Sequence, residues 1–166
     1  MTLLEEIKST VVEIKMEDPD GFKENLTVIA ARAGMGKTFS CLEATAGELD
    51  KGHSVLFFSM EETPIRLMKM AEVAGKAKSF AEGKIEFGHH QMKVGIFSII
   101  EEMRKKAISK EGLDFVVVDN FVTATGMHIS SLEESVLDYN LNLLGHAAKE
   151  LDCKVLVSLQ LARTAK

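Results

Sequence analysis

The sequence predicts an α/β fold in which helices cover both faces of a mainly parallel sheet. Four short runs rich in β-branched and aromatic residues stand out, at Thr27 to Ala31, Ser54 to Met60, Asp114 to Asn120 and Lys154 to Gln160. Their apolar residues are continuous rather than alternating, which is typical of strands buried on both faces. Helical patterns lie between the runs, and this alternation indicates right-handed crossover connections.

Length and composition indicate one compact globular domain. The chain has 166 residues, 46% of them hydrophobic, and a net charge of −5, which excludes a disordered or membrane-embedded protein. No apolar run approaches the roughly 20 residues of a membrane-spanning helix, and acidic residues near the N-terminus argue against a secretory signal. We therefore expect a cytoplasmic protein with no membrane partner. Cys41 and Cys153 lack framework spacing and are expected to be reduced core residues.

The first two helices are bounded by recognisable residues. A helix from Lys37 to Leu49 follows a glycine-rich turn, and Gly52 suits its end. Thr63 and Pro64 then predict the N-cap and first turn of a helix that runs to about Ala74.

Two longer amphipathic helices precede the third and fourth strands. Ser98 to Ser109 is expected to bury one face, made of Ile99, Ile100, Met103, Ala107 and Ile108. Arg104, Lys105 and Lys106 are expected on its solvated face. The second helix, Ser131 to Leu151, is expected to begin with a capping box from Ser131 to Glu134.

The stretch Ala74 to Lys93 contains several glycines and is expected to be a mobile segment outside the core. A short strand at Lys84 to Phe87 is weakly signalled within it. The pair His89 and His90 has no carboxylate or cysteine nearby at a ligand spacing, so we do not expect a metal site there.

The glycine-rich turn reads ARAGMGKT, from Ala31 to Thr38. A strand that runs into such a turn and then a helix directs backbone N–H groups and the positive helix end at one point, which suits a phosphate. Gly34 and Gly36 allow close backbone approach, Lys37 can reach the outer phosphates, and Thr38 can ligate Mg²⁺. Ala31 replaces the usual first glycine, a small change at the start of the turn. The alternative is a helix start with incidental glycines. The predicted nucleotide-binding residues are Ala31, Arg32, Ala33, Gly34, Met35, Gly36, Lys37 and Thr38.

Polar side chains follow the other three strands. Asp119 can hold Mg²⁺ opposite Thr38. Glu61 can orient water against the γ-phosphate, because the carboxyl ends of parallel strands meet at one edge of a sheet. Gln160 can contact the same phosphate. The alternatives are a turn residue for Asp119 and, for Glu61 and Glu62, acidic residues favoured near a helix N-terminus.

Four ordered stretches resemble the ATPase domain of DnaB-type replicative hexameric helicases, which belong to the RecA-like P-loop NTPases. They are VIAARAGMGKT, VLFFSMEE, GLDFVVVDN and AAKELDCKVLVSLQLAR, within about Asn25 to Arg163. The resemblance makes Ala31 a family trait and implies ATP and Mg²⁺ as cofactors. It further implies phosphate and metal binding by Lys37 and Thr38, metal binding by Asp119, a catalytic Glu61 and a γ-phosphate sensor at Gln160. Arg163 stands where the family has an arginine just beyond that glutamine.

Three departures from the family pattern affect the expected function. Asn120 replaces an aromatic residue, and Leu159 and Ala162 stand where the family usually has serine and asparagine around the glutamine, so coupling to DNA is in doubt. The stretch between the second helix and Asp119 is also shortened. The C-terminal part of the family domain, with its DNA-binding loops and arginine finger, is expected to be missing.

We expect the chain to consist of an N-terminal segment, residues 1 to 24, and a RecA-like ATPase core, residues 25 to 166. In RecA-like sheets the fourth strand lies between the first and third, which leaves the phosphate-loop strand near an exposed edge, a site for another chain. Val11 to Met16 is a candidate strand for that edge, and Thr2 to Lys8 a candidate docking helix. The alternative is a frayed tail.

The leading prediction is a helicase-like ATPase of DNA replication that hydrolyses ATP slowly on its own. One alternative is a shortened helicase relative, from a phage or mobile element, that binds a replicative helicase or its loader. Another is a RecA-like regulator or recombinase-type ATPase. A homo-oligomer, a hetero-assembly with a replicative helicase, and single-stranded DNA are the partners that these interpretations imply.

Overall fold

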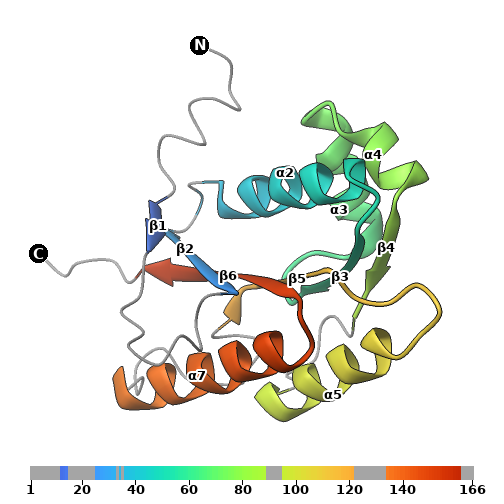
Figure 1. The fold of residues 1–166 in the computed structure, drawn as a ribbon. Coiled ribbons are helices and arrows are strands. Elements are labelled where there is room, and N and C mark those ends of the chain that lie inside the picture. Colours follow the sequence, from blue (N-terminus) through green and yellow to red (C-terminus); the bar gives the residue numbers. More distant parts are fainter. Residues whose placement is uncertain are drawn as a thin grey trace, which may run out of the picture.

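A single six-stranded sheet forms the centre of the molecule, in the order β1-β2-β6-β5-β3-β4 (Figure 1). The structure, a computed structural model, describes residues 12–14, 25–32, 34, 36–88, 95–121 and 134–161. The strands are β1 (Val12–Ile14), β2 (Leu26–Arg32), β3 (Ser54–Ser59), β4 (Lys84–Phe87), β5 (Phe115–Asp119) and β6 (Lys154–Leu161). The helices are α2 (Lys37–Asp50), α3 (Pro64–Val73), α4 (Ala77–Glu82), α5 (Gly95–Ala107) and α7 (Glu134–Glu150). The five strands from β2 to β4 run parallel, as predicted.

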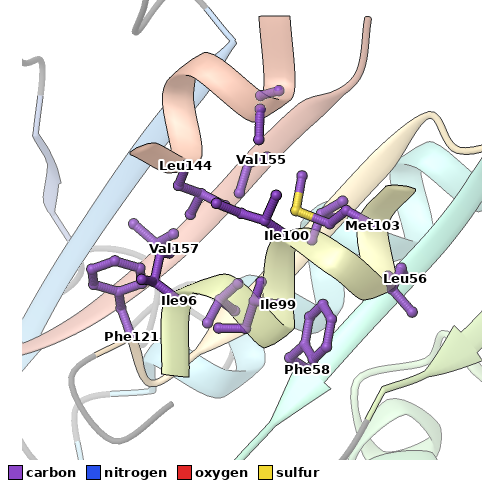
Figure 2. Packing of buried hydrophobic residues seen from close by; sticks show 14 of the residues in the cluster. Leu56, Phe58, Ile96, Ile99, Ile100, Met103, Phe121, Leu144, Val155 and Val157 are labelled. Carbon is purple, nitrogen blue, oxygen red and sulfur yellow. The ribbon is translucent and has the colours of Figure 1, made fainter. Parts of the chain in front are cut away.

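Helices cover both faces of the sheet and bury a separate apolar cluster on each. The first face carries α2, α3 and α4, and the second carries α5 and α7 (Figure 1). Between the sheet and α5 and α7, Ile99 and Met103 of α5 and Leu144 of α7 pack with Val157 of β6 (Figure 2). The expected sandwich of helices around a parallel sheet is therefore confirmed.

Alternation along the central strands decides which residues face α2. Phe57, Val117 and Leu156 belong to the cluster on the α2 face, whereas their neighbours Phe58, Val118 and Val157 belong to the cluster on the other face. Successive side chains of a strand point to opposite faces. Two residues further along each strand, Ser59, Asp119 and Ser158 therefore lie on the α2 face, at the carboxyl end of the sheet.

The order of the strands brings the ends of β2, β6 and β5 side by side. β6 lies between β2 and β5, as expected for a RecA-like sheet. β1 pairs antiparallel with β2, with Val12 opposite Ala30. The edge of the phosphate-loop strand, where a strand within Val11 to Met16 was expected, is thus covered by residues 12–14.

The helix before β5 differs from the predicted one at both ends. It begins at Gly95 rather than Ser98 and ends at Ala107, so Ile108 lies beyond it and is 87% exposed instead of packed. Lys106 is not solvated either, because its side chain is only 10% exposed and its Nζ lies 3.0 Å from Glu86 and 3.1 Å from Glu111. The ion pair with Glu86 connects α5 to the edge strand β4.

The stretch predicted to be a mobile segment contains two ordered elements, α4 and β4. Phe80 of α4 is 3% exposed and packs into the cluster on the α2 face. A single buried aromatic in a short helix produces little periodicity, which explains why α4 was missed. His89 and His90 lie outside the described residues.

Other predictions concern helix ends, cysteines and membrane segments. The Thr63 side chain caps α3 by accepting a hydrogen bond from the Arg66 backbone N–H at 3.3 Å. Ser131, which was expected to cap α7, lies outside the described residues. Cys41 and Cys153 are buried free thiols, as expected. Within the described ranges, none of the helices combines the length and apolar character needed to cross a bilayer.

Candidate nucleotide-binding site

The turn between β2 and α2 contains two glycines in left-handed backbone conformations. Gly34 and Gly36 have φ angles of 77° and 84°, in the left-handed region that side chains disfavour. A Cβ atom added at Gly34 meets nothing within 4 Å, so the backbone conformation, rather than crowding, requires glycine there. Gly36 is the N-cap of α2. The positive end of α2 therefore begins at the end of β2, where an anion is favoured.

Asp119 accepts hydrogen bonds from two hydroxyl groups on different elements. The Thr38 Oγ1–H group, in the first turn of α2, donates to Oδ2 at 2.9 Å, and the Ser158 Oγ–H group of β6 donates to Oδ1 at 2.6 Å. Asp119 and Ser158 are both buried. The three side chains thus join α2, β5 and β6 in one hydrogen-bonded chain.

Lys37 lies beside two carboxylates. Its Nζ atom is 3.9 Å from Asp119 Oδ1 and 3.7 Å from Glu61 Oε2. The Lys37 side chain is 9% exposed, whereas the Glu61 side chain is 47% exposed. The ammonium group is therefore held at the carboxyl edge of the sheet by one buried and one partly solvated carboxylate.

The remaining predicted residues lie at defined positions around this group. Gln160 of β6 is in register with Ala31 of β2, and by alternation it lies on the α2 face with Ser158. Ala31 is buried, while Arg32 is exposed at the end of β2. Ala33 and Met35 lie outside the described residues.

The two glutamates that follow β3 have different partners. Glu61 approaches Lys37, whereas Glu62 pairs with Arg66 at 2.8 Å, and its backbone N–H donates to the Ser59 hydroxyl. The Met60 N–H donates to the Asp119 carbonyl at 3.0 Å, which ties the end of β3 to the end of β5. Of the two glutamates, Glu61 is therefore the one that lies beside Lys37.

Burial keeps the nearby thiol of Cys41 protonated. Its pKa is raised well above the usual value, first by desolvation and then by the charge of Asp119, while Lys37 acts in the opposite direction. A thiol reacts as the thiolate. Cys41 is therefore a packing residue of α2.

The donor set fits a magnesium ion bound together with a nucleotide. Mg²⁺ prefers oxygen ligands and is usually held by one or two protein groups plus substrate phosphates. Thr38 and Asp119 are a hydroxyl and a carboxylate in direct contact. No group of three or more His, Cys, Asp or Glu side chains suited to a metal occurs among the described residues. A site completed by phosphate oxygens agrees with both observations.

Ser158 is a residue of this site that the sequence reasoning missed. The available signal was a polar residue inside the apolar run of β6, two positions before Gln160 and therefore on the same face. A hollow of about 570 Å³ between β4 and α5, lined by Glu86, Glu102 and Lys106 among others, contains none of the predicted site residues. The candidate site is therefore distinguished by its side-chain chemistry and not by the volume of this hollow.

Solved structures of other proteins share this fold, although no family model and no curated protein matches the sequence. One solved ATPase domain superposes with a TM-score of 0.68 at 20% identity, over 87% of this chain and 64% of that one. A DnaB-like replicative helicase, solved in a study of its interactions with primase, superposes with a TM-score of 0.64 at 18% identity, over 83% of this chain and 38% of that one.

At these identities the likeness concerns the fold, and this chain spans less than two thirds of each of the two proteins. The likeness nevertheless covers most of the present chain. The chain therefore shares its α/β fold, of the predicted RecA-like class, with an ATPase domain and a DnaB-like replicative helicase.

Proposed function

We propose that the chain binds ATP with Mg²⁺ at residues 31–38 and hydrolyses it. The observation that carries this proposal is the hydrogen bond between Thr38 and Asp119, with Lys37 Nζ within 4 Å of Asp119. A hydroxyl has one proton to donate and two lone pairs. Because the Thr38 proton is directed at Asp119, its lone pairs remain for a cation at the N-terminus of α2.

Each side chain has a separate role in this proposal. Lys37 and the N–H groups of the turn bind the outer phosphates, while Thr38 and Asp119 hold the metal. The metal supplies positive charge against the phosphate oxygens. Glu61, partly exposed at the same edge, accepts the proton of the attacking water. Gln160 contacts the γ-phosphate through its amide.

We propose that the isolated chain hydrolyses ATP slowly. In related phosphate chemistry an arginine finger from another chain raises kcat by about 10³ to 10⁵. The proposed biological role is that of a helicase-like ATPase in DNA replication, in line with the fold it shares with a DnaB-like replicative helicase. Stimulation of hydrolysis by single-stranded DNA tests this role. A rate that DNA leaves unchanged favours a RecA-like regulator instead.

Nucleotide binding is tested by titrating the purified protein with a fluorescent ATP analogue in Mg²⁺ buffer. Lys37→Ala removes the ammonium group and is expected to abolish detectable binding. Lys105→Ala removes a lysine whose side chain is 70% exposed on α5, and serves as the control. Equal affinity in the wild type and Lys37→Ala rejects the proposal.

A second proposed function is assembly with another chain, a second copy or a replicative helicase. Ile65 and Val73 of α3 are 73% and 74% exposed. They flank a groove of about 440 Å³ that also includes Phe39, the residue after Thr38. Apolar side chains grouped on one helix favour a protein contact. Ile65→Glu is expected to abolish self-association or co-elution with a replicative helicase in size-exclusion chromatography, without changing the circular dichroism spectrum. A wild-type chain that stays monomeric and elutes alone rejects assembly.

A further inference from the structure

We propose that Ser158 is a positioning residue for Asp119, and that its hydroxyl group sets the Mg²⁺ dependence of nucleotide binding. The inference rests on the proposed function and adds a residue to it. Its basis is the juxtaposition of three side chains, in which Ser158 and Thr38 donate to opposite oxygens of one buried carboxylate.

Ser158 is fully buried, so its hydroxyl group needs a hydrogen-bond partner within the protein. Ser158 is 0% exposed in a strand whose preceding residue, Val157, is equally buried. A hydroxyl group buried without a hydrogen bond is costly. The 2.6 Å contact with Asp119 Oδ1 offsets that cost, and a hydrogen bond to a carboxylate is stronger than one between neutral groups.

The two hydroxyl groups together fix the orientation of the carboxylate. Because Oδ1 accepts from β6 and Oδ2 accepts from α2, rotation of the Asp119 carboxylate breaks at least one hydrogen bond. Oδ2 is thereby kept against Thr38, the predicted metal ligand. Residues of this kind, which hold a metal-binding group in place, typically change metal affinity or activity about 10- to 100-fold when they are removed.

Ser158 also affects the position of the Lys37 side chain. Lys37 Nζ lies 3.9 Å from Oδ1, beyond hydrogen-bond distance, while the Ser158 hydroxyl group is bonded to that oxygen. Without the hydroxyl group, the Lys37 ammonium group, 3.9 Å away, is a donor close enough to take its place at Oδ1. Lys37 then moves toward Asp119 and away from a phosphate at the turn.

The position of Ser158 depends on the strand order. β6 lies between β2 and β5, and Val157 pairs with Val118, so the next residue of each strand is Ser158 and Asp119. Leu159, which stands where the family usually has serine, packs against the cluster on the opposite face. Ser158, one residue before Leu159, is therefore the residue whose side chain lies on the same face as Asp119.

The test measures the affinity of a fluorescent ATP analogue across a Mg²⁺ titration, with the chain purified in EDTA. In Ser158→Ala, the half-saturating Mg²⁺ concentration is expected to rise about 10- to 100-fold. Ser158→Thr, which keeps the hydroxyl group, is expected to restore most of the Mg²⁺ response. Ser158→Cys nearly keeps the side-chain volume but has only a weak donor, so it replaces the alanine variant in this test if the alanine variant does not fold.

Ser54→Ala provides the matched control. Ser54 is also a buried strand serine, 1% exposed, but at the other end of the sheet, and its hydroxyl oxygen has no hydrogen-bond partner among the described residues. Its removal is expected to leave the Mg²⁺ response unchanged. An equal change in Ser54→Ala and Ser158→Ala overturns the inference, because any buried serine would then have the same effect.

A metal-free measurement tests the contact directly. Unfolding of Ser158→Ala, Asp119→Ala and the double variant in EDTA gives a double-mutant cycle in which Asp119→Ala removes both acceptor oxygens, and we expect the two substitutions to be non-additive. Additive effects overturn the inference.

The outcomes also distinguish this inference from the proposed function. A wild-type chain that binds no nucleotide rejects both. A wild-type chain whose binding requires Mg²⁺, with the same requirement in a folded Ser158→Ala, rejects the role of Ser158 alone.

Discussion

Replacing Glu61 by glutamine is expected to separate nucleotide binding from hydrolysis. Glu61 Oε2 lies 3.7 Å from Lys37 Nζ, the group proposed to bind phosphate. The carboxylate therefore competes with a phosphate for the same ammonium group and repels the phosphate as well. Glutamine removes the negative charge at nearly constant volume, so it weakens this competition and also removes the proposed base.

The distance and exposure of Glu61 set the size of the effect on binding. Two unit charges about 4 Å apart interact by about 1 kcal/mol in water. The Glu61 side chain is 47% exposed, so screening by water is strong, and comparable exposed pairs contribute about 0.2 to 1 kcal/mol. Because about 1.4 kcal/mol is tenfold in affinity, we expect Glu61→Gln to bind ATP with unchanged to about fivefold higher affinity.

The effect on hydrolysis has the opposite sign and is larger. General base catalysis typically contributes about 10²- to 10⁴-fold to a rate, so the single-turnover rate of Glu61→Gln is expected to fall by about that factor. A phosphate-release assay at saturating ATP measures the rate, and an equilibrium titration of the same preparation measures the affinity.

Glu62→Gln is the matched control, because Glu62 pairs with Arg66 rather than with Lys37. It should leave the single-turnover rate of hydrolysis unchanged. A wild-type rate in Glu61→Gln, or a rate that falls equally in both variants, refutes the assignment of the base to Glu61.

Three further predictions concern stability and reactivity. Lys106→Met should lower the free energy of unfolding by about 1 kcal/mol in urea titrations, with the more exposed Lys105→Met as its control, because only the former removes a lysine buried against two carboxylates. Burial acts to lower the pKa of Lys106, yet hydrogen bonds to Glu86 and Glu111 raise it overall. The extra stability of the wild type over Lys106→Met should therefore be present below the unfolded pKa and be lost as the pH rises above 10.5. Gly88→Ala should destabilise the protein by about 1 to 3 kcal/mol, since its Cβ would lie 2.4 Å from the Phe58 ring, whereas Gly47→Ala, in open space within α2, should stabilise it by about 0.5 to 1 kcal/mol. Cys41, whose pKa burial raises, should react with a thiol reagent at pH 8 only as fast as the chain unfolds, and rapid labelling of the native protein contradicts its burial.

The parallel sheet was predictable because its strands are buried on both faces. Continuous apolar runs such as those of β3 and β5 are one local consequence of such burial, and Thr63-Pro64 is a local signal for the start of α3. The glycine-rich turn before α2 was equally predictable, because its chemistry depends on neighbouring residues in the chain. Local interactions determine these features, so the sequence alone predicts them.

Features that depend on contacts distant in sequence were predicted poorly. α4 is stabilised by Phe80 packing against the α2 face, and the solvated position expected for Lys106 was wrong because Glu86, twenty residues earlier by sequence number, lies beside it. Ile108 belongs to an apolar pattern, but α5 ends one residue before it. In each case a tertiary contact or a helix end overrode the local pattern.

The amino-acid sequence by itself determined the parallel α/β architecture, the glycine-rich turn before α2 and the acidic strand ends, because periodicity and turn chemistry are local. Only the tertiary structure decided that Glu62 pairs with Arg66 and that Ser158 donates to Asp119. Ser158 and Asp119 are 39 residues apart, and Thr38 and Asp119 are 81 apart. Such contacts exist because insertion of β6 between β2 and β5 brings these strand ends together, and no pattern within a short stretch of chain encodes that.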